Sequence, residues 1–195
     1  MTTIKYSMIC EDRAHQDFLR IILSQFANQD VEFIKVNTHI KAENDNQVDK
    51  RFVNACKVSF IDKRYKVNMF FVCRDADTHI ENGFKLKYSK FDTGLKGQYR
   101  DRCVIMLPVQ CIEHWLLYIK YHTEDSQLNI SHSLETILKN DVKQQVYGSN
   151  LPYEKKRLIV EELMKTANLE KLQNQSHSFN KFHNEFTSVL KTLLT

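Results

Sequence analysis

The sequence predicts an α/β fold with a parallel sheet, and three observations lead to this prediction. Short apolar segments rich in β-branched and aromatic residues alternate with longer segments of helical periodicity through about residue 110. The most apolar of them, residues 67–73, has the unbroken pattern of a strand that helices cover on both faces. Only four glycines and two prolines occur among 195 residues, which disfavours an all-β fold with many tight turns.

The first third of the chain is predicted to run β-α-β-α-β. Ile4–Cys10 and Val31–Val36 are strand candidates, and Asp12–Phe26 between them places its apolar residues on one helical face. Gln47–Arg64 repeats apolar residues every four positions and is predicted as a second helix, followed by the strand Val67–Cys73. These spacings suit right-handed crossovers in a parallel sheet.

The segment Thr78–Arg102 has no clear periodicity. Its glycines, including Gly83 and Gly94, lie among many lysines and tyrosines, so we expect a broken helix or a mobile basic loop. Cys103–Leu107 is predicted as a fourth strand, which Pro108 ends.

The chain after Pro108 is helical in pattern throughout. The predicted helices are one around Trp115 and three over Ser133–Val146, Pro152–Ala167 and Ser178–Leu194. The sequence therefore predicts an α/β core over residues 1–110. A helical C-terminal extension over residues 111–195 is expected to pack on this core.

Composition narrows the function classes. The five cysteines are scattered and form no C-x-x-C pair, so they read as buried core residues rather than disulfides or zinc ligands. No apolar run approaches the length of a membrane span, and the N-terminus lacks the zones of a signal peptide, so we expect a cytoplasmic protein without a membrane partner. The formal charge of +4 permits a polyanionic partner without requiring one.

Carboxylates follow two of the predicted strands. Glu11 comes directly after the first strand, and Asp75 and Asp77 come after the third. Because first and third strands are commonly neighbours in doubly wound sheets, we expect these three side chains to converge. Carboxylates in one place repel one another unless a cation lies among them, and Mg²⁺ or Mn²⁺ suits such a set of oxygen ligands. Each acid alone also fits a helix first turn or a turn residue.

Further polar residues lie close in sequence to these segments. Glu113, in the helix after the fourth strand, is a candidate fourth metal ligand or a plain first-turn charge. Arg13, Arg74 and Lys96 are candidate contacts for a substrate phosphate, although basic residues are mostly solvated surface. Candidates for supporting the site by proton transfer are His15, His79 and His114. The lysines of the helical half, including Lys139, fit either a surface that binds nucleic acid or a partner, or a solvated face, and their alternation with acids favours the solvated face.

The placement of Glu11 and of the Asp75-Ala76-Asp77 motif resembles the Toprim fold, which topoisomerases, primases and OLD-type nucleases share. The matching segments are SMICEDRAHQDFL and FFVCRDAD. LPVQCIEHWLL and SHSFNKFHNEF are similar to elements of a smaller branch of Toprim-related proteins, the RloB-type proteins associated with bacterial phage defence. The chain departs from many relatives in having no glycine beside the first Glu, so the backbone there approaches phosphate less closely.

This resemblance implies a Mg²⁺- or Mn²⁺-dependent nuclease that cleaves DNA or RNA and acts in phage defence. By the same resemblance Glu11 is the general base or a metal-linked acid, and Asp75 and Asp77 are metal ligands. The alternative is a non-catalytic Toprim-like module that binds nucleic acid or a partner ATPase. A phosphoacceptor receiver domain fits less well, because the fourth strand ends in Leu107 and Pro108 rather than a hydroxyl residue. The sequence leaves open whether the chain forms a homo-oligomer.

Overall fold

A computed structural model describes residues 1–124, 133–148 and 151–195 of the chain. Within these residues a four-stranded parallel sheet has the order β2-β1-β3-β4. The strands are β1 (Thr2–Cys10), β2 (Val31–Lys35), β3 (Met69–Cys73) and β4 (Cys103–Met106). The predicted α/β class with a parallel, Rossmann-like sheet is thereby confirmed, and so is the adjacency of the first and third strands.

The register of β1, β3 and β4 brings their carboxyl ends level. Cys10 of β1 lies opposite Cys73 of β3, which in turn lies opposite Met106 of β4. The backbone pairing continues past the ends, since Glu11 N–H donates to the Cys73 carbonyl at 3.0 Å. The residues that follow β1 and β3 are therefore neighbours in space.

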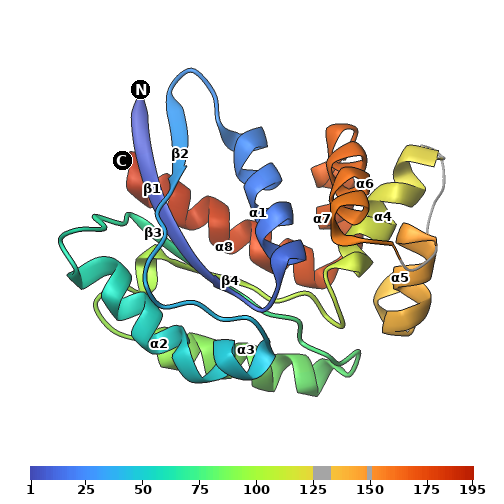
Figure 1. The fold of residues 1–195 in the computed structure, drawn as a ribbon, viewed down its shortest axis with the longest axis horizontal. Helices are drawn as coiled ribbons and strands as arrows, with labels where there is room; N and C mark the ends of the chain where they lie inside the picture. Colours follow the sequence, from blue (N-terminus) through green and yellow to red (C-terminus); the bar gives the residue numbers. More distant parts are fainter. Residues whose placement is uncertain (125–132, 149–150) are drawn as a thin grey trace.

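Helices cover both faces of the sheet (Figure 1). On one face lie α1 (Arg13–Phe26) and α8 (His177–Leu194), and on the other lie α2 (Asp45–Ile61) and α3 (Glu81–Leu95). Strand β3 is fully buried because its side chains alternate between the two faces: Phe71 enters the cluster with α1 and α8, whereas Phe70 enters the cluster with α2 and α3. This explains its unbroken apolar sequence.

The expectation of a broken helix or loop over residues 78–102 is wrong for most of that segment. Helix α3 runs unbroken from Glu81 to Leu95, and a short 3₁₀ turn (Arg100–Arg102) leads into β4. Its glycines do not interrupt it. At Gly94 a Cβ atom would lie 2.4 Å from Cζ of Phe52, so the glycine allows α3 to pack closely on α2.

The second half of the chain is helical, as predicted, with two differences in detail. The elements are α4 (Glu113–Glu124), a 3₁₀ turn (Leu134–Thr136), α5 (Lys139–Tyr147), α6 (Tyr153–Lys165) and α7 (Leu169–Gln175). The predicted helix 133–146 is divided at Ile137 and Leu138, because the Ile137 carbonyl accepts from Gln110 and His114 instead of from a helical N–H. Helix α7 has no counterpart in the prediction.

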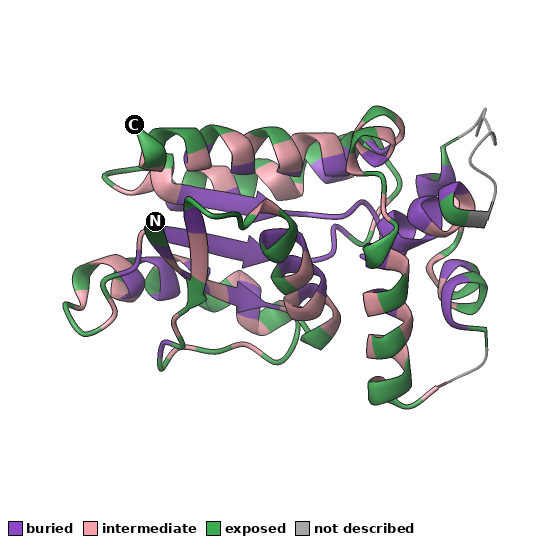
Figure 2. Ribbon diagram, turned by 90° about the horizontal axis from the view of Figure 1, so that it is seen from above, coloured by how far each residue is buried: buried purple, intermediate pink, exposed green. Residues whose placement is uncertain are grey.

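The helices after residue 110 share a core with the sheet. Trp115 of α4 is fully buried against Phe18 of α1 and against Phe179 and Phe182 of α8. Its indole N–H donates to Ser178 Oγ at 2.8 Å. Figure 2 shows α4 to α7 grouped beyond the carboxyl ends of the buried strands, while α8 lies along the sheet. Among the described helices none is long and apolar enough to cross a membrane.

Candidate metal centre

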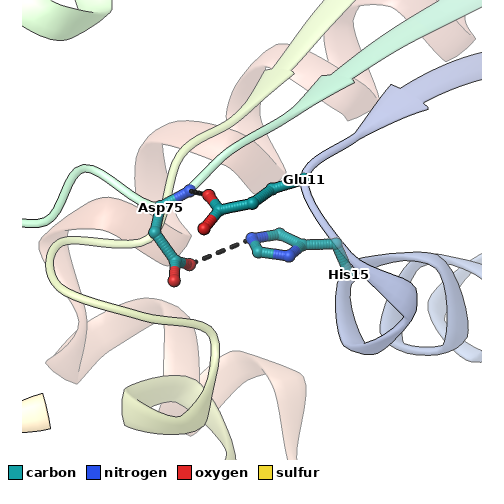
Figure 3. Close-up of side chains that lie close together, drawn as sticks. All are labelled: Glu11, His15 and Asp75. Carbon is teal, nitrogen blue, oxygen red and sulfur yellow. Dashed lines mark hydrogen bonds and ion pairs between the residues drawn. The ribbon is translucent and has the colours of Figure 1, made fainter. Parts of the chain in front are cut away.

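Glu11 and Asp75 meet at the carboxyl ends of β1 and β3, sixty-four positions apart in the chain. One oxygen of Glu11, Oε2, accepts the backbone N–H of Asp75 at 3.0 Å. Figure 3 shows the other Glu11 oxygen on the side of the Asp75 carboxylate and the His15 ring. A single ligand atom from each of Glu11, His15 and Asp75 lies within 4.8 Å of the others. The sheet register thus builds a compact group of one nitrogen and two oxygen donors.

His15 reaches this point because it lies in the first turn of α1. Asp12 caps that helix, accepting the backbone N–H of His15 at 3.1 Å, and its Oδ1 also lies 2.7 Å from His15 Nδ1. The opposite ring nitrogen, Nε2, lies 3.0 Å from Asp75 Oδ1. The imidazole is completely buried between the two carboxylates.

Arg74 is the buried cation of the site. Its Nη1 donates to Glu11 Oε2 at 3.0 Å and to the carboxylate of Asp77, and its Nη2 donates to Asp45 at 3.2 Å. A fourth carboxylate, on Asp49, lies 3.6 Å from Nε. The guanidinium is 5 % exposed, so it faces protein carboxylates rather than a solvent-accessible phosphate. This position differs from the substrate contact expected from the sequence.

Lys139, at the start of α5, closes the site from the helical half. Its ammonium donates to Asp75 Oδ2 at 2.8 Å and to Asp77 Oδ1 at 3.0 Å. Lys87 of α3 adds a longer ion pair to Asp77, at 3.5 Å. Asp77 is held with φ +52°, in the left-handed region that Asp tolerates better than most residues. Asp77 therefore lies beside the compact group and is paired with three cations.

These contacts shift the protonation of the site. Burial and the Asp75 charge raise the pKa of Glu11. Burial alone would lower the pKa of His15 and raise that of Asp75, but the two groups attract each other so strongly that the His15 pKa is raised well above its usual range and the Asp75 pKa is lowered. Burial would likewise raise the pKa of Asp77, but its hydrogen bonds with Arg74 and Lys139 lower that pKa. The site is a dense alternation of opposite charges.

Comparisons with protein families, with characterised proteins and with solved structures find no match to this chain.

Whether a divalent cation fits the site can be judged from two buried atoms. His15 Nε2 and Asp75 Oδ1 approach to 3.0 Å, yet they are not aligned as a hydrogen bond, and neither atom has another hydrogen-bond partner. The two atoms form an ion pair, and a metal ion bound by both would satisfy the hydrogen-bonding capacity that this pair leaves unused. Imidazole nitrogen and carboxylate oxygen are both donors that bind divalent metals. The residues present fit a metal ion.

A hollow of about 430 Å³ lies next to the centre, between α1, α5 and α6. Asp12 and Arg13 form one wall, and Glu113 lies in it with its side chain 8 % exposed and 3.9 Å from Lys143. The Arg13 guanidinium lies 5.1 Å from the centroid of the Tyr153 ring. Arg13 is thus exposed near the candidate site, whereas Glu113 is outside the compact donor group.

Three other residues singled out in the sequence are not members of the compact donor group. Lys96 follows the C-terminal end of α3 and precedes β4. It therefore lies near the amino ends of the strands, whereas the acids lie at the carboxyl ends. His114 is buried and bonds to Cys111 and to the Ile137 carbonyl, which is a structural role. His79 is exposed.

Two residues of the site, Lys139 and His15, have a larger role in the structure than the sequence pattern predicts. Lys139 lies in a predicted solvated face, and nothing in its helical period separates it from the other lysines. Only the division of the predicted helix at Ile137 and Leu138 brings α5 to the acids. His15 gave a better signal, because Asp12 lies three residues before it at the start of a helix, the spacing of a capping residue.

Proposed function

We propose that this chain is a metal-dependent nuclease of Toprim type that hydrolyses phosphodiester bonds in DNA or RNA. The observation that carries the proposal is the convergence of Glu11 and Asp75, from two separate strand ends, on the buried His15. Open α/β sheets place their chemistry at this edge. The resemblance of the Glu11 and Asp75–Asp77 segments to Toprim proteins supports the same conclusion, and the proposed role in phage defence rests on that resemblance.

Glu11, His15 and Asp75 would hold the metal, Mg²⁺ or Mn²⁺. When bound, a divalent cation supplies Lewis-acid stabilisation of the charge that develops on a phosphodiester. Glu11 Oε2 is held by Arg74 and by the Asp75 N–H, so its other oxygen is the one that would face the metal. Lys139 and Lys87 place ammonium groups beside Asp77, where they can attract a phosphate oxygen.

The test is cleavage of labelled single- and double-stranded DNA and RNA by the purified protein with Mg²⁺ or Mn²⁺. We expect cleavage that a chelator stops and that Glu11→Gln and Asp75→Asn each reduce by at least about 100-fold, the usual cost of removing a group that acts in the transition state. Asp30→Asn is the matched control, because Asp30 precedes β2 at the amino edge of the sheet. Full activity in both site variants would refute the proposal.

A second candidate is a non-catalytic module that binds nucleic acid or a partner ATPase. One observation favours it: Arg74 and Lys139 already neutralise the acids with the protein's own cations. A module of this kind binds labelled nucleic acid, measured by fluorescence anisotropy, equally well in chelator and in millimolar Mg²⁺ or Mn²⁺, and cleaves none. Cleavage lost in Glu11→Gln would exclude it.

A further inference from the structure

The donor set at the strand ends contains a nitrogen atom, which distinguishes it from an all-carboxylate site. His15 Nε2 lies 3.0 Å from Asp75 Oδ1, and a Glu11 oxygen lies within 4.8 Å of both. Carboxylate and water oxygens suit Mg²⁺, whereas imidazole nitrogen favours first-row transition ions. The identity of the third donor therefore bears on which metal the site selects.

Asp12 fixes which ring nitrogen of His15 is available. Its carboxylate can only accept hydrogen bonds, so the 2.7 Å contact with Nδ1 requires the hydrogen to be on that nitrogen. Asp12 is itself held in place, because it also caps α1 through the His15 backbone N–H. A carboxylate that orients the far nitrogen of a histidine is the usual support of a metal-binding imidazole. Nε2 is then the nitrogen directed to the acids.

The spacing of the donor atoms also suits a metal ion. Two ligand atoms at right angles around an octahedral ion, each about 2.1 Å from it, lie about 3.0 Å apart. That is the separation of His15 Nε2 and Asp75 Oδ1, which have no other hydrogen-bond partner. The protein's own cations occupy other oxygens, since Arg74 bonds to Glu11 Oε2 and Lys139 bonds to Asp75 Oδ2. One oxygen of each carboxylate is thus left on the side of the imidazole.

We propose that His15 is a nitrogen ligand of this centre, that Asp12 orients it, and that the site selects Mn²⁺ over Mg²⁺. This inference rests on the proposed metal site but assigns it a ligand and a metal preference of its own. Glu11 and Asp75 supply the oxygen donors, and Asp77 stays with Arg74 and Lys139 outside the donor group.

The first test is spectroscopic and needs no variant. Mn²⁺ is added to the wild-type protein, and electron spin echo envelope modulation is recorded. We expect the nitrogen coupling of a directly bound imidazole. Bound Mn²⁺ without any nitrogen coupling overturns the proposal, and so does an absence of Mn²⁺ binding at millimolar concentration.

The second test is calorimetric titration with Mn²⁺ alone and with Mg²⁺ alone. Wild-type protein is expected to bind Mn²⁺ at least about tenfold more tightly, and His15→Gln to lose this preference along with about 10–100-fold of its Mn²⁺ affinity. Asp12→Asn keeps a good helix cap but removes the charge that orients His15, so its loss of Mn²⁺ affinity should be smaller than that of His15→Gln. His39→Gln is the control, because His39 is exposed, bonds to Tyr65 and is outside the donor group, and it leaves both affinities unchanged. Equal affinity for the two ions in wild-type protein contradicts the proposal.

The outcomes separate this inference from the nuclease proposal. Nitrogen coupling in a protein that cleaves no nucleic acid keeps the His15 centre and refutes the nuclease. Cleavage that Glu11→Gln abolishes, in a protein without nitrogen coupling, keeps the nuclease and refutes the role of His15.

Discussion

Lys139 Nζ lies 2.8 Å from Asp75 Oδ2 and so joins the helical half of the chain to the end of β3. The same ammonium lies 3.0 Å from Asp77 Oδ1. Burial would lower the pKa of Lys139, but the two aspartates outweigh it and raise that pKa, so the charge is permanent at neutral pH. A fixed positive charge at the donor group must affect any cation that binds there.

Replacing this lysine is expected to strengthen metal binding. In Lys139→Met the dissociation constant for Mn²⁺ falls by about tenfold or more, because like charges a few ångströms apart repel by about 1 kcal/mol even in water and by more in a partly buried site. Calorimetric titration measures the change. Lys139→Arg, which keeps the charge, and Lys165→Met, on exposed α6 surface, serve as controls and stay near the wild-type value. Weaker binding in Lys139→Met would mean that the ammonium supports the donor group rather than competing with the ion.

Arg74 is expected to be essential for stability in the absence of metal. Arg74→Met leaves the carboxylates of Glu11, Asp49 and Asp77 without their common partner, and breaking a buried ion pair in this way costs about 3–5 kcal/mol. The partly exposed Asp77 lowers that figure, so about 3 kcal/mol is expected in urea denaturation. Arg64→Met, at an exposed pair with Asp62, should leave the free energy of unfolding nearly unchanged, because exposed ion pairs contribute little. A loss no larger than this control would contradict the structural role of Arg74.

The aspartates make stability depend on pH at the acid end. The pKa values of Asp75 and Asp77 are lowered in the folded state against the opposition of burial, by His15, Arg74 and Lys139. A lowered carboxyl pKa contributes stability that is present above the unfolded value of about 3.9 and is lost as the pH falls through the folded value. The free energy of unfolding, measured in chelator, should therefore fall below about pH 4. Asp75→Asn should flatten this fall; a profile as steep as that of wild-type protein would exclude Asp75 as a source.

Sequence periodicity predicted the fold well wherever the burial of a helix or strand is visible in its own sequence. Strand β3 is apolar at nearly every position because both of its faces are covered. The unbroken apolar run of this short segment is enough to predict that burial. The meeting of Glu11 with Asp75 needed one further rule, the adjacency of first and third strands. Arg74 contacts Asp45 and Asp49 of α2, and Lys139 of α5 contacts Asp75. These contacts depend on where α2 and α5 begin in space, and no local sequence pattern encodes that.

Gly94 is a position in α3 where a side chain would collide with Phe52, and this close packing can be tested directly. In an ordinary helix Gly→Ala stabilises by about 1 kcal/mol. Here the added Cβ would lie 2.4 Å from the Phe52 ring, so Gly94→Ala should instead destabilise, by about 1–3 kcal/mol as overpacking does. Thermal and urea denaturation measure the sign. Ser89→Ala, at an exposed position of the same helix, should be neutral or slightly stabilising. Stabilisation by Gly94→Ala would show that α2 and α3 are not packed this closely.

The hollow beside the candidate centre is expected to hold nucleic acid. Lys156 lies in it with its ammonium 5.4 Å from the centroid of the Tyr147 ring, and a cation beside an aromatic face suits a phosphate and a stacked base. Lys156→Ala should weaken binding of single-stranded DNA or RNA and reduce the slope of log affinity against log salt by about one, the effect of losing one phosphate contact. Fluorescence anisotropy over a series of salt concentrations measures both.

Mn²⁺ affinity provides the internal check on that variant, because Lys156 is not among the donor residues and should leave it unchanged. Lys165→Ala, on the same helix as Lys156 and paired with Glu162 on an exposed surface, is the matched control and should keep the wild-type slope. The hollow is lined by acids as well as bases, including Asp12 and Glu113, so its basic side must supply the attraction. If Lys156→Ala and Lys165→Ala give the same slope as wild-type protein, nucleic acid approaches the acids by another route.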